Sequence, residues 1–308
     1  FVPTPAKSHY LFNLRDVSRV IHGVCLAHPA TMRDSFSLIR LWLHESLRVF
    51  YDRLVDEADR LWLLNELSVI ARKQFGQDIL TYTNWTEITT ENARGFLFTD
   101  FMSRLQGTSG SAATKQYTAV TDLETLQRAI ENSQEEMNAM NGTNSSLVIF
   151  RFAAEHVARI CRVLSLPRGH VMLVGVGGSG RRSLARLAAH IVDADLVQID
   201  ITKSFGRAEW RDELKALVKK SALGRPVVFL FSDTQAKEEY MIEDIGNLLN
   251  SGEVPNLFAA DEMITAAESV RSLAQQADRL GNGSIQTLFD FFLSLVRRNL
   301  HIILCMSP

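Results

Sequence analysis

Residues 171–184 have the sequence Val-Met-Leu-Val-Gly175-Val-Gly177-Gly178-Ser179-Gly180-Arg181-Arg182-Ser183-Leu. A short apolar segment of strand type runs here directly into a glycine-rich loop, and the loop runs into a segment of helical type. Glycines let a backbone approach a phosphate closely, and a helix N-terminus adds free N–H groups and the positive end of a dipole. Four glycines in six residues are costly for a turn that binds nothing, so this stretch predicts a phosphate-binding loop.

Two classes of phosphate loop share this glycine spacing, and the first is the dinucleotide-binding loop. Gly175, Gly177 and Gly180 match its G-x-G-x-x-G pattern. Asp200 follows Gly180 by 20 residues, at the end of the next apolar segment, where a ribose-binding carboxylate would lie. An oxidoreductase that uses a nicotinamide dinucleotide is therefore one open interpretation.

The second class is the P-loop of nucleoside triphosphate-binding proteins. Gly175 and Gly180 match its G-x-x-x-x-G frame, after which the motif has Lys and then Ser or Thr. These two positions are Arg181 and Arg182 here, and a hydroxyl comes one place later, at Ser183. The arginine pair favours a phosphate-rich ligand, but the loop alone leaves both classes open.

A further apolar segment, residues 227–233, favours the P-loop. It has the sequence Val-Val-Phe-Leu-Phe-Ser-Asp and ends in Asp233. In P-loop proteins an acid at the end of such a strand holds Mg²⁺ beside the nucleotide, whereas a dinucleotide enzyme needs no acid there. Asp233 could instead be a helix N-cap. We take Asp233 and the Ser183 hydroxyl as the candidate magnesium ligands.

Residues 147–308 alternate between helical and strand patterns. The spacing predicts helices over 151–166, 183–192, 209–223, 238–250 and 285–298, and strands over 171–174, 196–199, 227–231 and 301–305. Strands that alternate with helices are typical of parallel βαβ units. This part is therefore predicted to be an α/β domain whose ligand lies at the carboxyl ends of the strands.

Residues 1–75 are predicted to be a small all-helical domain, with a capping box at Asn13 and Asp16. Trp42 and Trp62 fall on its apolar stripes, which predicts core packing for both. Residues 76–146 are richer in Thr, Asn, Ser and Gly, and 107–114 have the composition of an exposed linker.

One helix is expected within residues 76–146. A capping box of Thr121 and Glu124 would open it, and Gly142 would end it.

Composition excludes several classes of protein. The chain of 308 residues is long enough for about two domains. Its net charge of −2 gives no basic field for nucleic acid, and it has no apolar run of the roughly 20 residues that cross a bilayer. Three widely spaced cysteines argue against a disulfide scaffold and for a reducing compartment. We therefore expect neither a nucleic-acid nor a membrane partner.

Four segments resemble dynein heavy chains, and together the resemblance covers nearly the whole chain. Residues 173–189 resemble the phosphate loop of the fourth AAA+ module, and 248–258 resemble a dynein-specific segment of the same module. Residues 231–235 resemble the axonemal version of the magnesium strand, and 3–16 resemble the start of the helical subdomain that closes the third module.

The resemblance implies a piece of a motor ring. Residues 1–75 would be the helical lid of module three, 76–146 a linker with one helix, and 147–308 the large subdomain of module four. The implied fold is a P-loop AAA+ parallel sheet flanked by helices, preceded by the small helical subdomain. The implied ligand is ATP or ADP with Mg²⁺ at Ser183 and Asp233.

The resemblance also assigns individual residues. Arg15 matches the sensor-two arginine that reaches the nucleotide of the preceding module, and Thr234 stands where the family has a glutamate that orients the attacking water. No catalytic residue is therefore assigned. The nucleotide-binding residues are predicted to be Gly175, Gly177, Gly178, Ser179, Gly180, Arg181, Arg182, Ser183 and, near the position of the first polar sensor, Ser307.

The resemblance thus implies a regulatory nucleotide-binding module with weak or no hydrolysis, within an axonemal dynein that moves toward microtubule minus ends. Its implied partners are the other AAA+ modules, the microtubule through a distant stalk, and intermediate and light chains. The implied location is the cytoplasm and the axonemal cytoskeleton of cilia. A dinucleotide oxidoreductase and a structural ring segment with an empty site are the alternatives.

Overall fold

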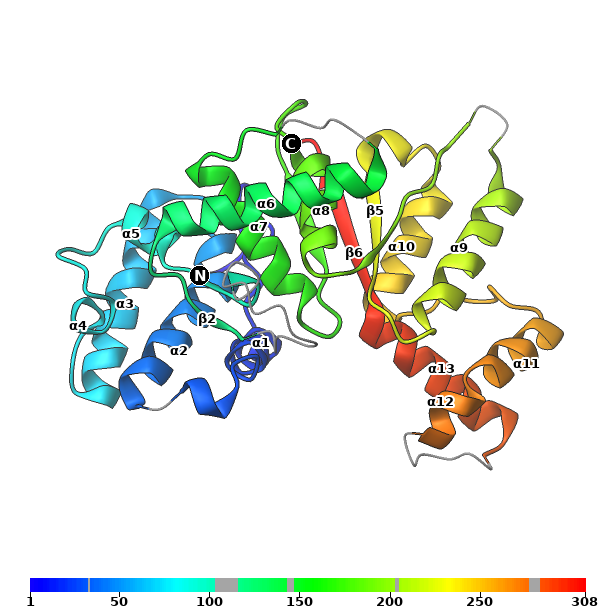
Figure 1. Ribbon diagram of the computed structural model, residues 1–308, viewed down its shortest axis with the longest axis horizontal. Coiled ribbons are helices and arrows are strands. Elements are labelled where there is room, and N and C mark those ends of the chain that lie inside the picture. The colour runs from blue at the N-terminus through cyan, green and yellow to red at the C-terminus, as the bar shows by residue number, and fades with distance from the viewer. Residues whose placement is uncertain (33, 103–115, 143–146, 203–204, 277–282) are drawn as a thin grey trace. The chain divides into compact units, whose positions relative to one another are not determined.

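The computed structural model describes residues 1–32, 34–102, 116–142, 147–202, 205–276 and 283–308. The chain divides into two compact units, residues 1–162 and residues 163–308 (Figure 1). The predicted linker at 107–114 lies outside the described residues. The predicted α/β fold is confirmed by a four-stranded parallel sheet flanked by helices in the second unit.

The unit 1–162 is mainly helical. Two short strands, β1 (Phe98–Thr99) and β2 (Thr118–Ala119), pair in antiparallel orientation. One helix was predicted within 76–146, so α4 (Ile79–Thr83), α5 (Thr90–Gly95) and this strand pair are additional. The helices are α1 (Leu14–Val24), η1 (Pro29–Thr31), α2 (Ser35–Val49), η2 (Tyr51–Arg53), α3 (Glu57–Phe75), α4 (Ile79–Thr83), α5 (Thr90–Gly95), α6 (Leu123–Asn141) and most of α7 (Arg151–Leu164).

Capping side chains determine where these helices begin. The predicted box at Asn13 and Asp16 is confirmed. The Asp16 carboxylate accepts the backbone amide of Asn13, and the Asn13 side-chain oxygen accepts the backbone amide of Arg15. At α6 the predicted box is wrong. Asp122 takes the N-cap position instead of Thr121 and accepts hydrogen bonds from the backbone amides of Glu124 and Thr125. A carboxylate accepts both amides and suits the positive helix end.

The core of this unit lies between α2, α3, α4 and the β1–β2 pair. Leu41, Leu43 and Leu64 are fully or almost fully buried there. Core packing was predicted for both tryptophans. The prediction is confirmed for Trp42, which packs against this core, and is wrong for Trp62, which is 51% exposed and contacts Phe1 edge-on.

A buried ion pair joins α2 to α7. Glu45 is fully buried, and its carboxylate accepts hydrogen bonds from Arg162 Nε at 2.9 Å and from the Tyr117 hydroxyl at 2.7 Å. The buried His44 ring contacts the Tyr117 hydroxyl at 3.1 Å through Nε2 and the Phe96 carbonyl at 2.9 Å through Nδ1. Charges that leave water need such partners, so this network ties the two helices together.

The unit 163–308 is built on a parallel sheet in the order β3-β6-β5-β4. In register, Val171 of β3 lies beside Ile303 of β6, and Phe229 of β5 lies beside Ile302. The central strands β5 and β6 are mostly buried, which explains their continuous apolar sequence. The strands are β3 (Val171–Val174), β4 (Asp195–Val197), β5 (Val227–Ser232) and β6 (Leu300–Met306).

Helices cover both faces of this sheet. Phe229 and Phe231 of β5 belong to a core shared with α9, α10 and α13, while α8 contacts the sheet and lies on its other side (Figure 1). The predicted helices are present, α8 beginning two residues earlier than expected, and α11 and α12 were not predicted. The helices are α8 (Arg181–Ile191), α9 (Arg207–Ser221), η4 (Asp233–Gln235), α10 (Glu239–Ser251), α11 (Ala260–Ser269), α12 (Arg271–Gln276) and α13 (Ile285–Asn299).

Candidate functional site

The glycine loop connects the end of β3 to the start of α8, as the sequence predicted. Gly178 and Gly180 have φ angles of 80° and 79°, a left-handed conformation that glycine adopts without steric cost. Gly180 is the N-cap of α8, and no side chain among the described residues caps this helix end. Its first amides therefore face the loop without an internal acceptor, which is the arrangement that binds anions.

Arg181, at the position of the P-loop lysine, folds back onto the protein. Its guanidinium donates to the carbonyl of Met306 at the end of β6 and, at 3.3 Å, to the carbonyl of Val176 in the loop itself. These bonds hold the loop against β6, and Gly175 adds a third link by donating its amide to Met306 at 3.1 Å. A phosphate that engages Arg181 must compete with these two carbonyls.

Arg182, the next residue, points toward the end of β5. Its Nη2 donates to the Thr234 hydroxyl at 3.3 Å, and both residues are exposed. The structure thus brings together two of the three positions at which this chain departs from the P-loop pattern: the arginine at the usual Ser/Thr and the threonine that the resemblance placed at the usual glutamate.

Asp233 joins the ends of β5 and β6. Its Oδ2 accepts the Ser307 amide at 2.9 Å and also the Ser307 hydroxyl, and its Oδ1 accepts the Thr234 amide at 2.8 Å. The Ser307 hydroxyl is the main reason why the pKa of Asp233 lies below its ordinary value. The carboxylate is therefore ionised at neutral pH and engaged on both oxygens.

Gln235 is a structural residue of the site that the sequence analysis missed. Its Oε1 accepts the Ser232 amide at 2.8 Å, and its Nε2 donates to the Ile199 carbonyl at 2.6 Å. It therefore links the end of β5 to the segment that follows β4. The signal was present in the sequence, since Ser232 and Gln235 have the spacing of a capping box.

The residues present do not fit a magnesium ion. In the P-loop frame the hydroxyl that holds Mg²⁺ belongs at Arg182, and Ser183 lies one residue on, about 100° further around the helix. Both oxygens of Asp233 already accept hydrogen bonds from the protein. Within the described ranges, no group of three or more His, Cys, Asp or Glu side chains could hold a metal ion. The magnesium ligands Ser183 and Asp233 stay a prediction that this donor set disfavours.

Two further predicted positions lie outside the cluster. Arg15 is exposed on the first turn of α1, in the unit 1–162. Asp200 is exposed three residues beyond the end of β4, which stops at Val197, earlier than expected. The sheet edge therefore brings together Arg181, Arg182, Asp233, Thr234 and Ser307.

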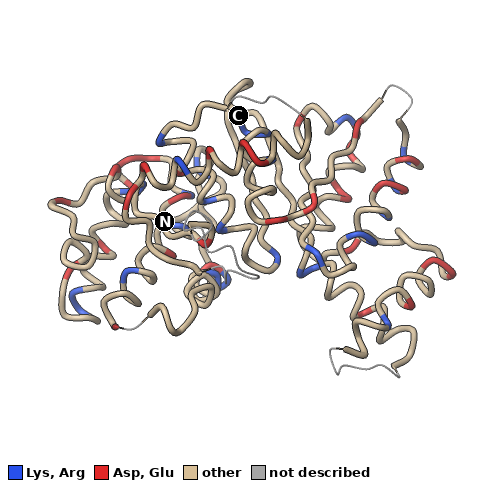
Figure 2. Tube along the Cα trace, viewed as in Figure 1, with Lys and Arg blue, Asp and Glu red and all other residues tan. Residues whose placement is uncertain are grey.

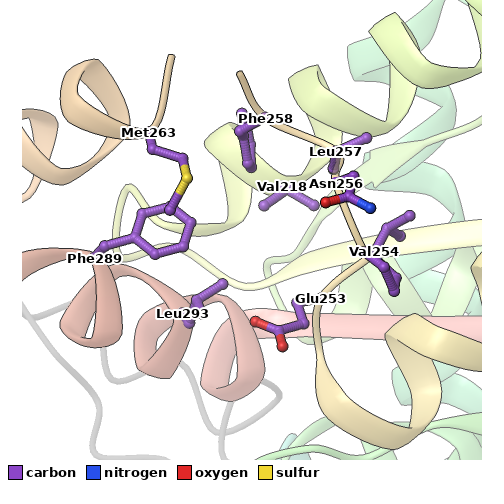
Figure 3. Close-up of a pocket in the computed structure, with 10 residues that line it drawn as sticks. Val218, Glu253, Val254, Asn256, Leu257, Phe258, Met263, Phe289 and Leu293 are labelled. Atoms are coloured by element: carbon purple, nitrogen blue, oxygen red, sulfur yellow. The ribbon is translucent and has the colours of Figure 1, made fainter. Parts of the chain in front are cut away.

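A separate pocket of about 250 Å³ lies in the same unit, at the segment 253–258 (Figure 3). Its walls are mostly apolar, and Phe258, Met263, Phe289 and Leu293 point toward its interior. Glu253 is the charged side chain among its lining residues. None of the glycine-loop residues line it.

Charges do not gather on one segment of the described chain. Figure 2 shows Lys and Arg interspersed with Asp and Glu along both units. A search of the described helices finds none that is both long and apolar enough to cross a membrane.

Comparison with known families assigns both parts of the chain. Residues 145–308 match the family model described as "P-loop containing dynein motor region D4", and residues 1–85 match an AAA+ lid domain. The chain belongs to the dynein heavy chain family. The resemblance inferred from the glycine loop and the three other segments is thereby confirmed, as are the AAA+ and P-loop assignments.

Individual relatives agree with this family. Dynein axonemal heavy chain 3 and dynein axonemal heavy chain 1 of Homo sapiens are each 41% identical to this chain over its full length. The dynein-1-beta heavy chain of the flagellar inner arm I1 complex of Chlamydomonas reinhardtii is 39% identical. This dynein chain spans 8%, 7% and 7% of the length of these relatives, respectively. It is an AAA+ segment of a dynein heavy chain.

The two compact units meet at residue 162, within α7. Most of α7 packs in the unit 1–162 through Arg162 and Glu155, although residues 147–308 were predicted as one domain. The division at 75 and 146 stays a prediction.

Proposed function

We propose that this chain is a regulatory module of an axonemal dynein motor ring, one that binds ATP or ADP and hydrolyses ATP weakly or not at all. The observation that carries the proposal is the uncapped N-terminus of α8, preceded by a loop in which Gly178 and Gly180 take left-handed conformations. In this proposal the amides from Gly177 to Arg182 hold the β-phosphate.

The proposal of weak hydrolysis rests on Thr234. Hydrolysis of ATP needs a group that orients water in line with the γ-phosphate, and in this site a threonine stands where the family has a carboxylate. Its hydroxyl already bonds Arg182 and lies 2.9 Å from the Ser232 hydroxyl. The two glutamates that follow, Glu238 and Glu239, are exposed at the start of α10. We therefore assign no catalytic residue.

The whole motor is proposed by analogy with the axonemal relatives. In it this segment contacts the other AAA+ modules of the same heavy chain, and Arg15 reaches the nucleotide held by the preceding module. The motor would move toward microtubule minus ends through a distant stalk, with intermediate and light chains attached, in the axoneme of cilia. The exposure of Arg15 supports its proposed role, because an exposed guanidinium is available to a neighbouring module.

Calorimetry with ATP, ADP and NAD tests the proposal against its alternatives. We expect ATP or ADP to bind to the wild-type chain and NAD to give no heat. Binding of NAD would support the dinucleotide oxidoreductase instead. A chain that binds none of the three would be a structural segment with an empty site.

A further inference from the structure

We propose that the Arg182 guanidinium takes the place of the magnesium ion, so that this site binds nucleotide phosphates without a divalent cation. The inference rests on the proposed nucleotide binding. Gly175 and Gly180 determine how the chain aligns with the P-loop motif. In this alignment Arg182 stands where the motif has the hydroxyl that binds magnesium. The positive charge at this position is therefore supplied by a side chain of the protein.

The position of the Arg182 side chain supports the substitution. In P-loop proteins the metal lies between the first turn of the helix and the acid at the end of the neighbouring strand. Arg182 spans this interval, since it starts in the first turn of α8 and reaches the Thr234 hydroxyl, next to Asp233, at 3.3 Å. A metal and this guanidinium would compete for the same space.

Asp233 is arranged to balance charge instead of holding a metal. Ser307 occupies its Oδ2 and the Thr234 amide occupies its Oδ1. Arg182 can bind a phosphate while Asp233 keeps these hydrogen bonds. The carboxylate then compensates part of the positive charge of Arg181 and Arg182, which stand in adjacent positions.

The chemistry of arginine suits this task. A guanidinium is always protonated and presents planar donors that match two phosphate oxygens at once. Arg182 is exposed, and its hydrogen bond to Thr234 is long at 3.3 Å, so little is lost when that bond breaks and the guanidinium turns to a ligand. Arg181 keeps the positive charge of the P-loop lysine, and Arg182 adds a further positive charge at the place of the metal.

The test measures the affinity for a fluorescent ADP analogue in EDTA and in excess Mg²⁺, by fluorescence titration of the 308-residue chain. The wild type should bind at least as tightly in EDTA as in Mg²⁺. Arg182→Thr restores the hydroxyl of the motif and should bind weakly in EDTA, with at least about a tenfold gain in Mg²⁺. Arg182→Ala should be weak in both.

Arg186→Thr is the matched control. Arg186 stands one turn later on the same helix, is exposed, and bonds the Gln198 side chain at 2.8 Å. Its removal should leave tight binding in EDTA intact. Thermal melts of all variants establish that each is folded.

The outcomes separate the two proposals. Wild-type binding that appears with Mg²⁺ and is lost in EDTA overturns the role of Arg182 and leaves the nucleotide site standing. Wild-type binding that is absent in both conditions overturns the nucleotide site and the inference with it. If Mg²⁺ changes the affinity of Arg182→Thr for the ADP analogue no more than it changes that of the wild type, the proposal that Arg182 replaces the metal is also rejected.

Discussion

Gly23 of α1 lies directly against the carboxylate of Glu45 in α2. A Cβ on Gly23 would overlap Glu45 Oε2 and stand 3.0 Å from Arg162 Nη2. The absence of a side chain at this position lets α1 pack closely over the buried ion pair that joins α2 to α7. A small change at Gly23 therefore acts on a charged group that cannot move into water.

We expect Gly23→Ala to lower the free energy of unfolding by about 1–3 kcal/mol, because the added methyl displaces a buried charge from its partner. Denaturant titration measures it. Gly246→Ala is the control: Gly246 also lies in a helix, α10, but a Cβ there meets no atom within 4 Å. Alanine should be neutral or stabilising by up to about 1 kcal/mol there. Equal effects at both sites would contradict the packing described for Gly23.

Much of the α/β unit was predictable because its signals are local. β3 has the predicted bounds, and α8 follows the glycine loop as predicted, although it begins two residues earlier than expected. The helices α11 and α12 escaped because small residues form their buried faces, Ala266, Ala267 and Ala274, where no stripe of large apolar side chains appears. Trp62 was wrongly predicted to be buried. Because α3 also exposes the apolar residues Val69 and Ile70, its pattern of apolar residues does not identify a single buried face.

Other parts of the site depend on contacts between distant residues. Arg182 and Thr234 are 52 positions apart in the chain, and Asp233 and Ser307 are 74 apart. Their pairing follows from the order β3-β6-β5-β4, which places the ends of β5 and β6 side by side. The sequence predicted that these residues share one sheet edge, but the direction in which each side chain points required the structure.

Substitution of Gly180 should abolish nucleotide binding. Gly180→Val forces a β-branched residue to a φ of +79° and moves the first amides of α8. Gly224→Val is the matched control, since Gly224 has a φ of +89°, also in open space, between α9 and β5. Both variants should lose about 1–3 kcal/mol of stability. Isothermal titration with ADP should show lost affinity for Gly180→Val alone, and intact affinity there would reject the loop as the site.

Replacement of Asp200 distinguishes the P-loop from the dinucleotide interpretation. Asp200 is exposed and lies beyond β4, and it takes no part in the cluster at the ends of β5 and β6. Asp200→Asn should therefore leave the affinity for ATP within about threefold of the wild-type value. A change of that size in binding free energy is smaller than the contribution of one ordinary hydrogen bond. A chain that binds NAD and loses that binding in Asp200→Asn would establish the dinucleotide site instead.

Acid should destabilise the unit 1–162 through His44 and His156. Burial lowers the pKa of His44 well below its ordinary value and that of His156 to about 4. The unfolded chain takes up these protons below about pH 6.5 while the folded chain does not, so stability is complete above that pH. It should fall from pH 6.5 toward pH 4, by at most about 1.4 kcal/mol per pH unit for each histidine.

Denaturant titrations between pH 7 and pH 4.5 measure this slope. His156→Gln removes one titrating group and should give a shallower fall than the wild type. A slope that is unchanged in His156→Gln would show that His156 does not contribute to the acid sensitivity.

The last prediction concerns hydrolysis. The wild-type chain should release no phosphate from ATP above background, because Thr234 cannot orient water as a carboxylate does and Arg182 occupies the position of the metal-binding hydroxyl. Thr234→Glu alone should remain inactive, since its carboxylate would pair with Arg182. The double variant Arg182→Thr with Thr234→Glu restores the metal-binding hydroxyl and the carboxylate, while Arg181 keeps the positive charge of the lysine. It should gain turnover that requires Mg²⁺, measured in the complete heavy chain against the same chain without these changes. Mg²⁺-dependent hydrolysis by the unmodified chain that disappears in Asp233→Ala would instead make this module a working ATPase.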